Sequence, residues 1–181
     1  MHNIKIFLAS SSELKTDREQ FEIFHYRQNK LWVKQGIFLE IIIWEDFFDA
    51  LSPTRLQDEY NKEIKHCDLF VMLFHTKVGK YTAEEFETAF GRFQATQKPF
   101  IFTYRKDAVS GKNAPSPEDA ASLKSFLQKL DQLGHFPTIY KNIEGLQLHF
   151  SRQLDRLAAK GFMEMPALSK AGAAPSPGAT G

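Results

Sequence analysis

The run "DLFVMLF", residues 68–74, is apolar at every position after its aspartate. A strand with one face in water alternates apolar and polar residues, whereas a strand covered on both faces is continuously apolar. The run therefore predicts a strand inside a parallel sheet, with helices packed above and below it.

Four further runs rich in Ile, Val and Phe predict the rest of the sheet. They are "IKIFLAS" (4–10), "IFLEIIIW" (37–44), "PFIFTYR" (99–105) and the weaker "FPTIYK" (136–141). Apolar residues at helical spacing follow each of the five strands, in the segments 14–31, 56–64, 86–93, 123–133 and 143–157. Strict alternation of strand and helix implies right-handed crossovers. We expect an α/β flavodoxin-like fold, a doubly wound five-stranded parallel sheet of order 2-1-3-4-5 with helices on both faces.

The length of the chain fits one domain. With 181 residues, 43% of them apolar, the chain can bury one sizeable core but not two comparable ones. We assign this α/β domain to residues 1–162. Residues 163–181 are rich in Ala, Pro and Gly and cannot pack a core, so we expect a disordered tail or a linker toward further domains.

Charge and cysteine content exclude several classes of partner. The 23 basic and 22 acidic residues nearly cancel, so neither direct nucleic-acid binding nor membrane binding is expected. Cys67 is the single cysteine, which excludes an internal disulfide and a cysteine-rich metal site. The apolar runs are too short to span a bilayer, and "MHNIKIFLAS" is no signal peptide. We therefore expect a cytoplasmic protein.

Polar and aromatic residues follow the first three strands, where a doubly wound sheet binds its ligand. These segments are "SSSE" (10–13), "WEDF" (44–47) and "HTKVGKYTAEE" (75–85). The serines fit a helix N-cap, or an anion site built on the same helix end. Trp44 fits a core position, or a platform that stacks on a purine or nicotinamide ring.

Several common site motifs are absent from the sequence. "GKYT" (79–82) lacks the serine or threonine that follows Gly-Lys in a phosphate loop, and "ASSSELK" contains no glycine for a dehydrogenase-type dinucleotide site. No G-x-S-x-G elbow is present, and the histidines show no metal-ligand spacing. Redox use of NAD, serine hydrolysis and metal catalysis are therefore disfavoured.

Three glutamates cluster in "TAEEFE", residues 82–87. Thr82 and Glu85 match a capping box, in which the threonine caps a helix and the glutamate three residues on returns the hydrogen bond. Glu84 and Glu87 fit solvated helix charges. Glu85 lies beside the apolar stripe of this helix, at the boundary of core and cleft, where a shielded carboxylate has an altered pKa and usable reactivity. Periodicity alone leaves both roles of Glu85 open.

Two stretches of the chain resemble a known family. "KIFLASSSELKTDRE" and "CDLFVMLFHTKVGKYTAEEFETAFGRFQATQKPFIFTY" are similar to TIR-like (Toll/interleukin-1 receptor-like) domains of bacterial defence receptors and STAND-type NTPases. The second stretch also resembles nucleoside 2-deoxyribosyltransferases, through Asp68, T-x-x-E-x-x-x-A at residues 82–89, and Lys98-Pro99. The resemblance covers about residues 3–105.

The resemblance implies an NAD+ nucleosidase (NAD+ glycohydrolase) that cleaves the nicotinamide–ribose bond with Glu85 as the catalytic residue. NAD+ is then the substrate, and no cofactor is implied. Ser10 and Ser11 would line the phosphate or ribose side, and Trp44, Asp46 and Tyr81 the nicotinamide-ribose side. The resemblance also implies the effector module of a prokaryotic immune receptor in antiviral defence, activated by oligomerisation through TIR-type interfaces. A non-catalytic TIR-type interaction module and a nucleoside 2-deoxyribosyltransferase are the alternatives.

Overall fold

The computed structural model describes residues 1–44, 55–107 and 114–162. The predicted tail or linker, residues 163–181, lies outside this part of the chain. Within the described residues no helix combines the length and the apolarity needed to cross a bilayer.

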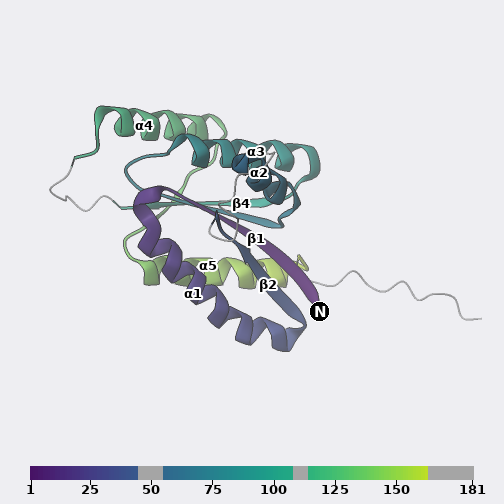
Figure 1. Ribbon diagram of the computed structural model, residues 1–181. Helices are drawn as coiled ribbons and strands as arrows, with labels where there is room; N and C mark the ends of the chain where they lie inside the picture. The colour runs from purple at the N-terminus through teal and green to yellow at the C-terminus, as the bar shows by residue number, and fades with distance from the viewer. Residues whose placement is uncertain (45–54, 108–113, 163–181) are drawn as a thin grey trace, which may run out of the picture.

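One parallel sheet organises the domain (Figure 1). Its strands lie in the order β2-β1-β3-β4-β5, and every neighbouring pair is parallel. The predicted flavodoxin-like fold class and strand order are therefore confirmed. The strands are β1 (His2–Ser10), β2 (Ile37–Ile42), β3 (Leu69–Phe74), β4 (Phe100–Lys106) and β5 (Thr138–Tyr140).

Helices cover both faces of the sheet. In Figure 1, α1 and α5 lie on one face and α2, α3 and α4 on the other. Short 3₁₀ turns, Ser12–Leu14 and Val33–Gln35, flank α1 at its two ends. The helices are α1 (Lys15–Trp32), α2 (Leu56–His66), α3 (Lys80–Thr96), α4 (Pro117–Gln132) and α5 (Ile143–Ala159).

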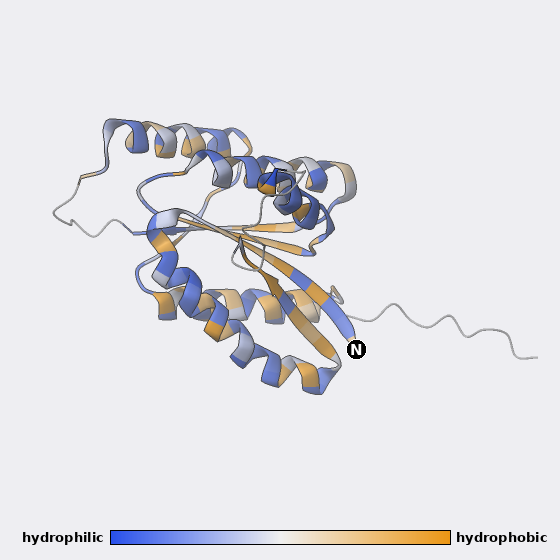
Figure 2. Ribbon diagram, in the orientation of Figure 1, coloured by the Kyte–Doolittle hydropathy of each residue, from blue (hydrophilic) through white to orange (hydrophobic). Residues whose placement is uncertain are grey.

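β3 supplies side chains to two separate cores. All six of its residues are fully buried. Leu69, Val71 and Leu73 join the core under α1 and α5, whereas Phe70, Met72 and Phe74 join the core under α2, α3 and α4. Successive side chains of a strand point to opposite faces, so a strand between two helical layers must be apolar throughout. Figure 2 shows the matching apolar bands on the strands and on the inner sides of the helices.

The fifth strand is shorter than the sequence predicts. β5 spans three residues and pairs with β4 at Thr138, Ile139 and Tyr140. Phe136, the first residue of the predicted strand, is 73% exposed and lies outside it. An edge strand has a partner on one side only, so fewer ladder positions fix its ends than in β3.

A buried asparagine of α1 holds the outer edge of β2. The Asn29 Nδ2 donates to the Leu39 carbonyl oxygen, and the Leu39 N–H donates to the Asn29 Oδ1, both at 2.7 Å. The His25 Nε2 lies 2.5 Å from the same carbonyl oxygen. Buried backbone groups that lack a strand partner need another one, and Asn29 provides it where the edge faces the helix.

Replacing Asn29 with alanine leaves the Leu39 N–H without its partner in a buried setting. We expect Asn29→Ala to lower the free energy of unfolding by about 1–3 kcal/mol, which is the cost of one buried polar group left unpaired. Urea unfolding followed by circular dichroism measures this. Asn3→Ala is the matched control: Asn3 bonds Glu40 at an exposed position, and its loss should cost less than about 1 kcal/mol. Equal losses in both variants would contradict this role of Asn29.

Candidate functional site

A pocket opens at the carboxyl ends of the central strands. Its volume is about 390 Å³. The end of β1 forms its floor, α2 and α3 form its walls, and Trp44 lies beside it. The lining residues are Phe7, Leu8, Ala9, Ser10, Trp44, Arg55, Leu56, Gln57, Tyr60, Tyr81, Thr82 and Glu85. The pocket thus lies beside β1, where the strand order reverses and ligands of doubly wound sheets bind.

Glu85 is the buried carboxylate of this pocket. The residue is 8% exposed and belongs to the face of α3 that also carries Thr82, Phe86 and Ala89. Burial raises the pKa of Glu85 to about 7, and the nearby charge of Glu84 adds to the rise, whereas a hydrogen bond from the Gln57 side chain opposes it. The carboxyl group is therefore poised between its neutral and charged forms near neutral pH.

The predicted capping box is wrong. α3 begins at Lys80, with Gly79 at the N-cap and no side-chain capping bond. Thr82 lies inside the first turn, and its hydroxyl donates to the Ser10 carbonyl oxygen at 3.5 Å, which links α3 to the end of β1. The Ala83 N–H donates to the Gly79 carbonyl oxygen at 2.9 Å, so the N-cap lies three residues before Thr82 and the helix starts two residues before it. Glu85 accordingly lines the pocket that Gln57 of α2 also lines, and does not cap the helix.

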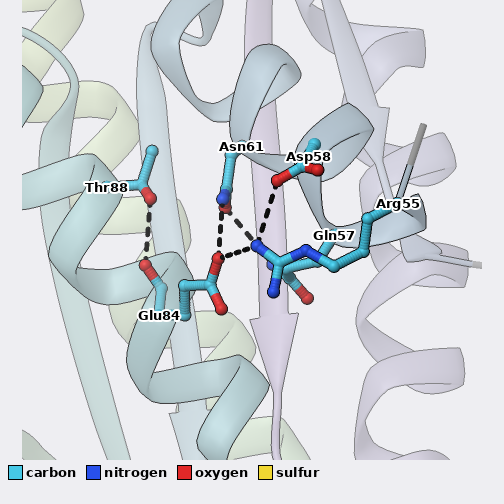
Figure 3. Close-up of polar contacts among 6 residues, drawn as sticks. All are labelled: Arg55, Gln57, Asp58, Asn61, Glu84 and Thr88. Atoms are coloured by element: carbon cyan, nitrogen blue, oxygen red, sulfur yellow. Dashed lines mark hydrogen bonds and ion pairs between the residues drawn. The ribbon is translucent and has the colours of Figure 1, made fainter.

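The other two glutamates have defined partners. The Glu84 Oε1 accepts from the Arg55 Nη2 at 2.8 Å and from the Asn61 Nδ2 at 2.9 Å, as Figure 3 shows. These contacts, led by the Asn61 hydrogen bond, lower the pKa of Glu84. Glu87 is exposed and pairs with Lys129 of α4. Glu84 is therefore more than a solvated helix charge, because it ties α3 to α2.

A second pocket of about 400 Å³ adjoins the first and shares Ser10, Trp44, Tyr81 and Thr82 with it. Four cationic residues line this second pocket: Lys15, Arg18, Lys77 and Lys80. Ser11, Ser12, Gly79 and Asp119 complete the lining. The two pockets together form one cleft, with a buried carboxyl group in one half and a concentration of positive charge in the other.

Arg18 stands at the junction of the two halves. Its Nη1 donates to the Ser10 Oγ at 2.6 Å, and its guanidinium carbon lies 5.3 Å from the centre of the Trp44 ring. The residue is 3% exposed, so its charge lies in a shielded setting. A shielded guanidinium interacts more strongly with an anion than a solvated one does.

The structure brings most of the predicted site residues together. Glu85, Ser10, Trp44 and Tyr81 line the first pocket, and Ser11 lines the second. Ser11 is almost fully buried: its N–H donates to the Leu73 carbonyl oxygen at 2.9 Å and its hydroxyl to the Glu13 Oε1 at 3.3 Å. Trp44 and Tyr81 are 45% and 60% exposed at the rim. Asp46 lies outside the described residues.

Two positions of the recognised sequence pattern lie far from the cleft. Asp68 precedes β3, at the amino end of the sheet, where its Oδ2 accepts from the Lys5 N–H at 2.9 Å. Its Oδ1 lies 3.3 Å from the Nζ of Lys98. Asp68 and Lys98 therefore join β1, β3 and the start of β4. Of the residues in this pattern, Thr82 and Glu85 line the cleft.

Sequence reasoning missed Glu13, Arg18 and Gln57. The Glu13 carboxylate accepts from the Thr76 N–H at 2.8 Å and the Lys77 N–H at 3.2 Å, and so fixes the loop that leads into α3. Arg18 follows the buried Leu14 by four residues, a helical spacing that places both on one face. Gln57 gave no signal, because its contact with Glu85 depends on how α2 packs against α3. Within residues 1–44, 55–107 and 114–162, no group of three or more His, Cys, Asp or Glu side chains fits a metal ion.

A flavodoxin-like sheet with a cleft at its switch point defines the class of protein. Residues 5–155 match the family described as "Domain of unknown function (DUF4062)", and the chain belongs to this family. No curated protein matches the chain. Among solved structures, "Crystal structure of the RPS4 and RRS1 TIR domain heterodimer" is similar at a TM-score of 0.46 and 13% sequence identity, over 86% of this chain and 97% of that chain.

The burial of Glu85 predicts how stability depends on pH. The pKa of about 7 in the folded state exceeds the unfolded value, so this group stabilises the fold most at low pH and the contribution is lost as the pH rises through 7. Glu85→Gln keeps the shape and removes the charge. We expect the variant to exceed the wild type in stability at pH 8 by up to about 3 kcal/mol, and to match it near pH 4.5.

Urea unfolding at the two pH values measures this difference. Glu19→Gln, at an exposed position of α1, is the control and should change stability by less than about 0.5 kcal/mol at either pH. A Glu85→Gln variant that is less stable than the wild type at pH 8 would show that the folded chain favours the charged carboxylate.

Proposed function

We propose that the chain is a TIR-like NAD+ glycohydrolase with Glu85 as its catalytic residue. The observation that carries the proposal is the cleft itself, in which a buried carboxyl group with a pKa near 7 adjoins a pocket lined by four cations. The resemblance of residues 82–89 to T-x-x-E-x-x-x-A supports the same residue. A dinucleotide with a cleavable glycosidic bond and a pyrophosphate matches both halves of the cleft.

The chemistry of NAD+ fits a single carboxylate. Nicotinamide leaves C1′ as a neutral pyridine, so no general acid has to protonate it, unlike the leaving group of a glycosidase. The ribose carbon becomes an oxocarbenium-like cation as the bond breaks. Ionised Glu85 stabilises this cation or forms a transient ester with C1′, and attack by water completes the hydrolysis to ADP-ribose. The proton taken from water leaves with the solvent.

The remaining lining residues divide the substrate between them. Arg18 and the three lysines hold the pyrophosphate, and the Ser10 and Ser11 side of the cleft carries the adjoining ribose. Trp44 and Tyr81 lie where both pockets meet and stack against the rings. A nucleoside carries no phosphate and would leave the cationic half unused, so the cleft favours a nucleotide over the substrate of a nucleoside 2-deoxyribosyltransferase.

The resemblance to defence-receptor TIR domains supports a role in a larger assembly. In this proposal the domain is the cytoplasmic effector module of a prokaryotic immune receptor and becomes active when copies associate. Further domains or a sensor partner would then supply the signal that brings the copies together.

Nicotinamide release from NAD+ tests the proposed reaction. We expect release by the purified chain to rise more steeply than linearly with protein concentration, and to fall by at least about 100-fold in Glu85→Gln, because the charge that meets the oxocarbenium ion is lost. Glu87→Gln, an exposed position of the same helix, is the matched control and should keep wild-type activity.

Two outcomes would contradict the assignment. Undiminished turnover by Glu85→Gln would remove Glu85 from the reaction. Absence of turnover in a chain held at high local concentration on a multivalent scaffold would favour a non-catalytic interaction module. Base exchange between deoxyinosine and adenine, read by mass spectrometry, would instead favour the deoxyribosyltransferase.

The cationic pocket predicts a dependence on substrate charge. The double substitution Lys77→Gln and Lys80→Gln removes two of the four cations of this pocket. Both lysines lie outside the core, since Lys80 is exposed and Lys77 is half-buried, so we expect the variant to fold. We expect KM for NAD+ to rise by about tenfold, at roughly 1 kcal/mol or less per lost charge contact. KM for nicotinamide riboside, which lacks phosphate, should stay unchanged. Equal changes for both substrates would show that the lysines do not contact phosphate.

A further inference from the structure

A chain of side-chain amides connects Glu85 with Glu84 through α2. Gln57 is 4% exposed and lines the same pocket as Glu85, and its side chain acts to lower the pKa of that carboxyl group. The Gln57 Nε2 donates to the Asn61 Oδ1 at 3.2 Å, and the Asn61 Nδ2 donates to the Glu84 Oε1 at 2.9 Å. Figure 3 shows Gln57, Asn61 and Glu84 in this arrangement, with Arg55 beside them.

The direction of these hydrogen bonds follows from Glu84. An ionised carboxylate only accepts hydrogen bonds, so Asn61 must turn its NH₂ group toward Glu84 and its carbonyl oxygen toward Gln57. That oxygen in turn requires the NH₂ group of Gln57. An amide NH₂ carries two hydrogens, and the second one is available to the carboxylate of Glu85. The Arg55 Nη2 lies 2.8 Å from the Glu84 Oε1 and favours the ionised form of Glu84. This ionised form fixes the direction of the other hydrogen bonds.

We propose that Gln57 is a positioning residue for Glu85, and that Glu84, acting through Asn61, sets the orientation in which Gln57 donates a hydrogen bond to the Glu85 carboxylate. The amide relay, as we name the chain Glu84–Asn61–Gln57–Glu85, belongs to the folded chain whatever its substrate. Its consequence for turnover rests on the proposed function. The relay also makes the catalytic carboxylate depend on the packing of α2 against α3.

Other groups also line the pocket around Glu85. Arg55 and Tyr60 reach the pocket from the start and middle of α2, and Tyr81 from α3. β1 contributes only uncharged side chains there, from Phe7 to Ser10. Glu84 acts in two opposed ways, since its charge disfavours a charged Glu85 while its hydrogen bond orients the relay. Substitutions at Gln57 and Asn61 separate the relay from that charge.

A carbon-13 NMR titration of the Glu85 carboxyl group, in the full chain without NAD+, tests the relay directly. The Glu85→Gln spectrum assigns the resonance. We expect Gln57→Met, which keeps the length and removes the donor, to raise the pKa of Glu85 by about one unit, because the charged carboxylate loses a hydrogen bond. Asn61→Ala frees Gln57 to turn over and should raise the pKa in the same direction by less.

Gln153→Met is the matched control, a half-buried glutamine of α5 on the other face of the sheet, and should leave the pKa of Glu85 unchanged. An unshifted pKa in Gln57→Met would overturn the positioning role. A shift in Gln57→Met without one in Asn61→Ala would overturn the part of Asn61 and Glu84. Asn61 is half-exposed and lines neither pocket, so its variant keeps the test decisive if Gln57→Met fails to fold.

Kinetics separate the relay from the proposed function. With NAD+ turnover, the acid limb of kcat against pH should move to higher pH in Gln57→Met by the same amount as the NMR midpoint, and kcat should recover at high pH. An NMR shift in a chain without turnover would uphold the relay and contradict the NAD+ glycohydrolase. Turnover of NAD+ in Gln57→Met with an unshifted acid limb and an unshifted NMR midpoint would uphold the NAD+ glycohydrolase and contradict the relay.

Discussion

The burial of β3 on both faces is the constraint on which the rest of the structure depends. Its six side chains divide between two cores, so neither helical layer can be removed without exposing apolar surface. A parallel strand at the centre also forces its neighbours to be reached by crossovers on opposite faces. The crossovers diverge beside β1, and the carboxyl end of β1 forms the floor of the cleft. The site is therefore a consequence of topology before any polar residue is considered.

Much of the fold can be predicted from the sequence because buried strands need continuous runs of apolar residues. The apolar runs gave four of the five strands nearly to the residue, and Phe136–Lys141 overestimated β5 because an edge strand carries a weaker pattern. The predicted start of α3 at Thr82 was wrong because a capping box is a local signal. The helix begins after Gly79, and Glu13 holds the preceding loop through hydrogen bonds from the Thr76 and Lys77 N–H groups. Local signals fail where a tertiary contact competes with them.

The residues of the candidate site likewise fall into those that the sequence could predict and those that it could not. Glu85, Ser10, Trp44 and Tyr81 were accessible to sequence reasoning because each follows a recognisable strand or belongs to a recognised pattern. Arg18 and Gln57 reach the cleft from helices whose rotation about their axes is set by packing. A glutamine at a buried helix position carries no signature of a carboxylate partner, and only the packing of α2 against α3 brings it into the pocket of Glu85.

The energetic cost of a buried carboxylate suits the proposed reaction. With a pKa near 7, ionisation of Glu85 lowers the stability of the folded chain, because burial disfavours the charged form. A positive charge that develops at C1′ offsets that loss only as the glycosidic bond breaks, so the gain is larger in the transition state than in the free protein. A fully solvated carboxylate would gain little from the same cation, because water already stabilises it. The hydrogen bond from Gln57 must therefore be strong enough to keep a fraction of Glu85 ionised and weak enough to leave it under-stabilised. One amide donor, oriented from outside the pocket, meets both conditions.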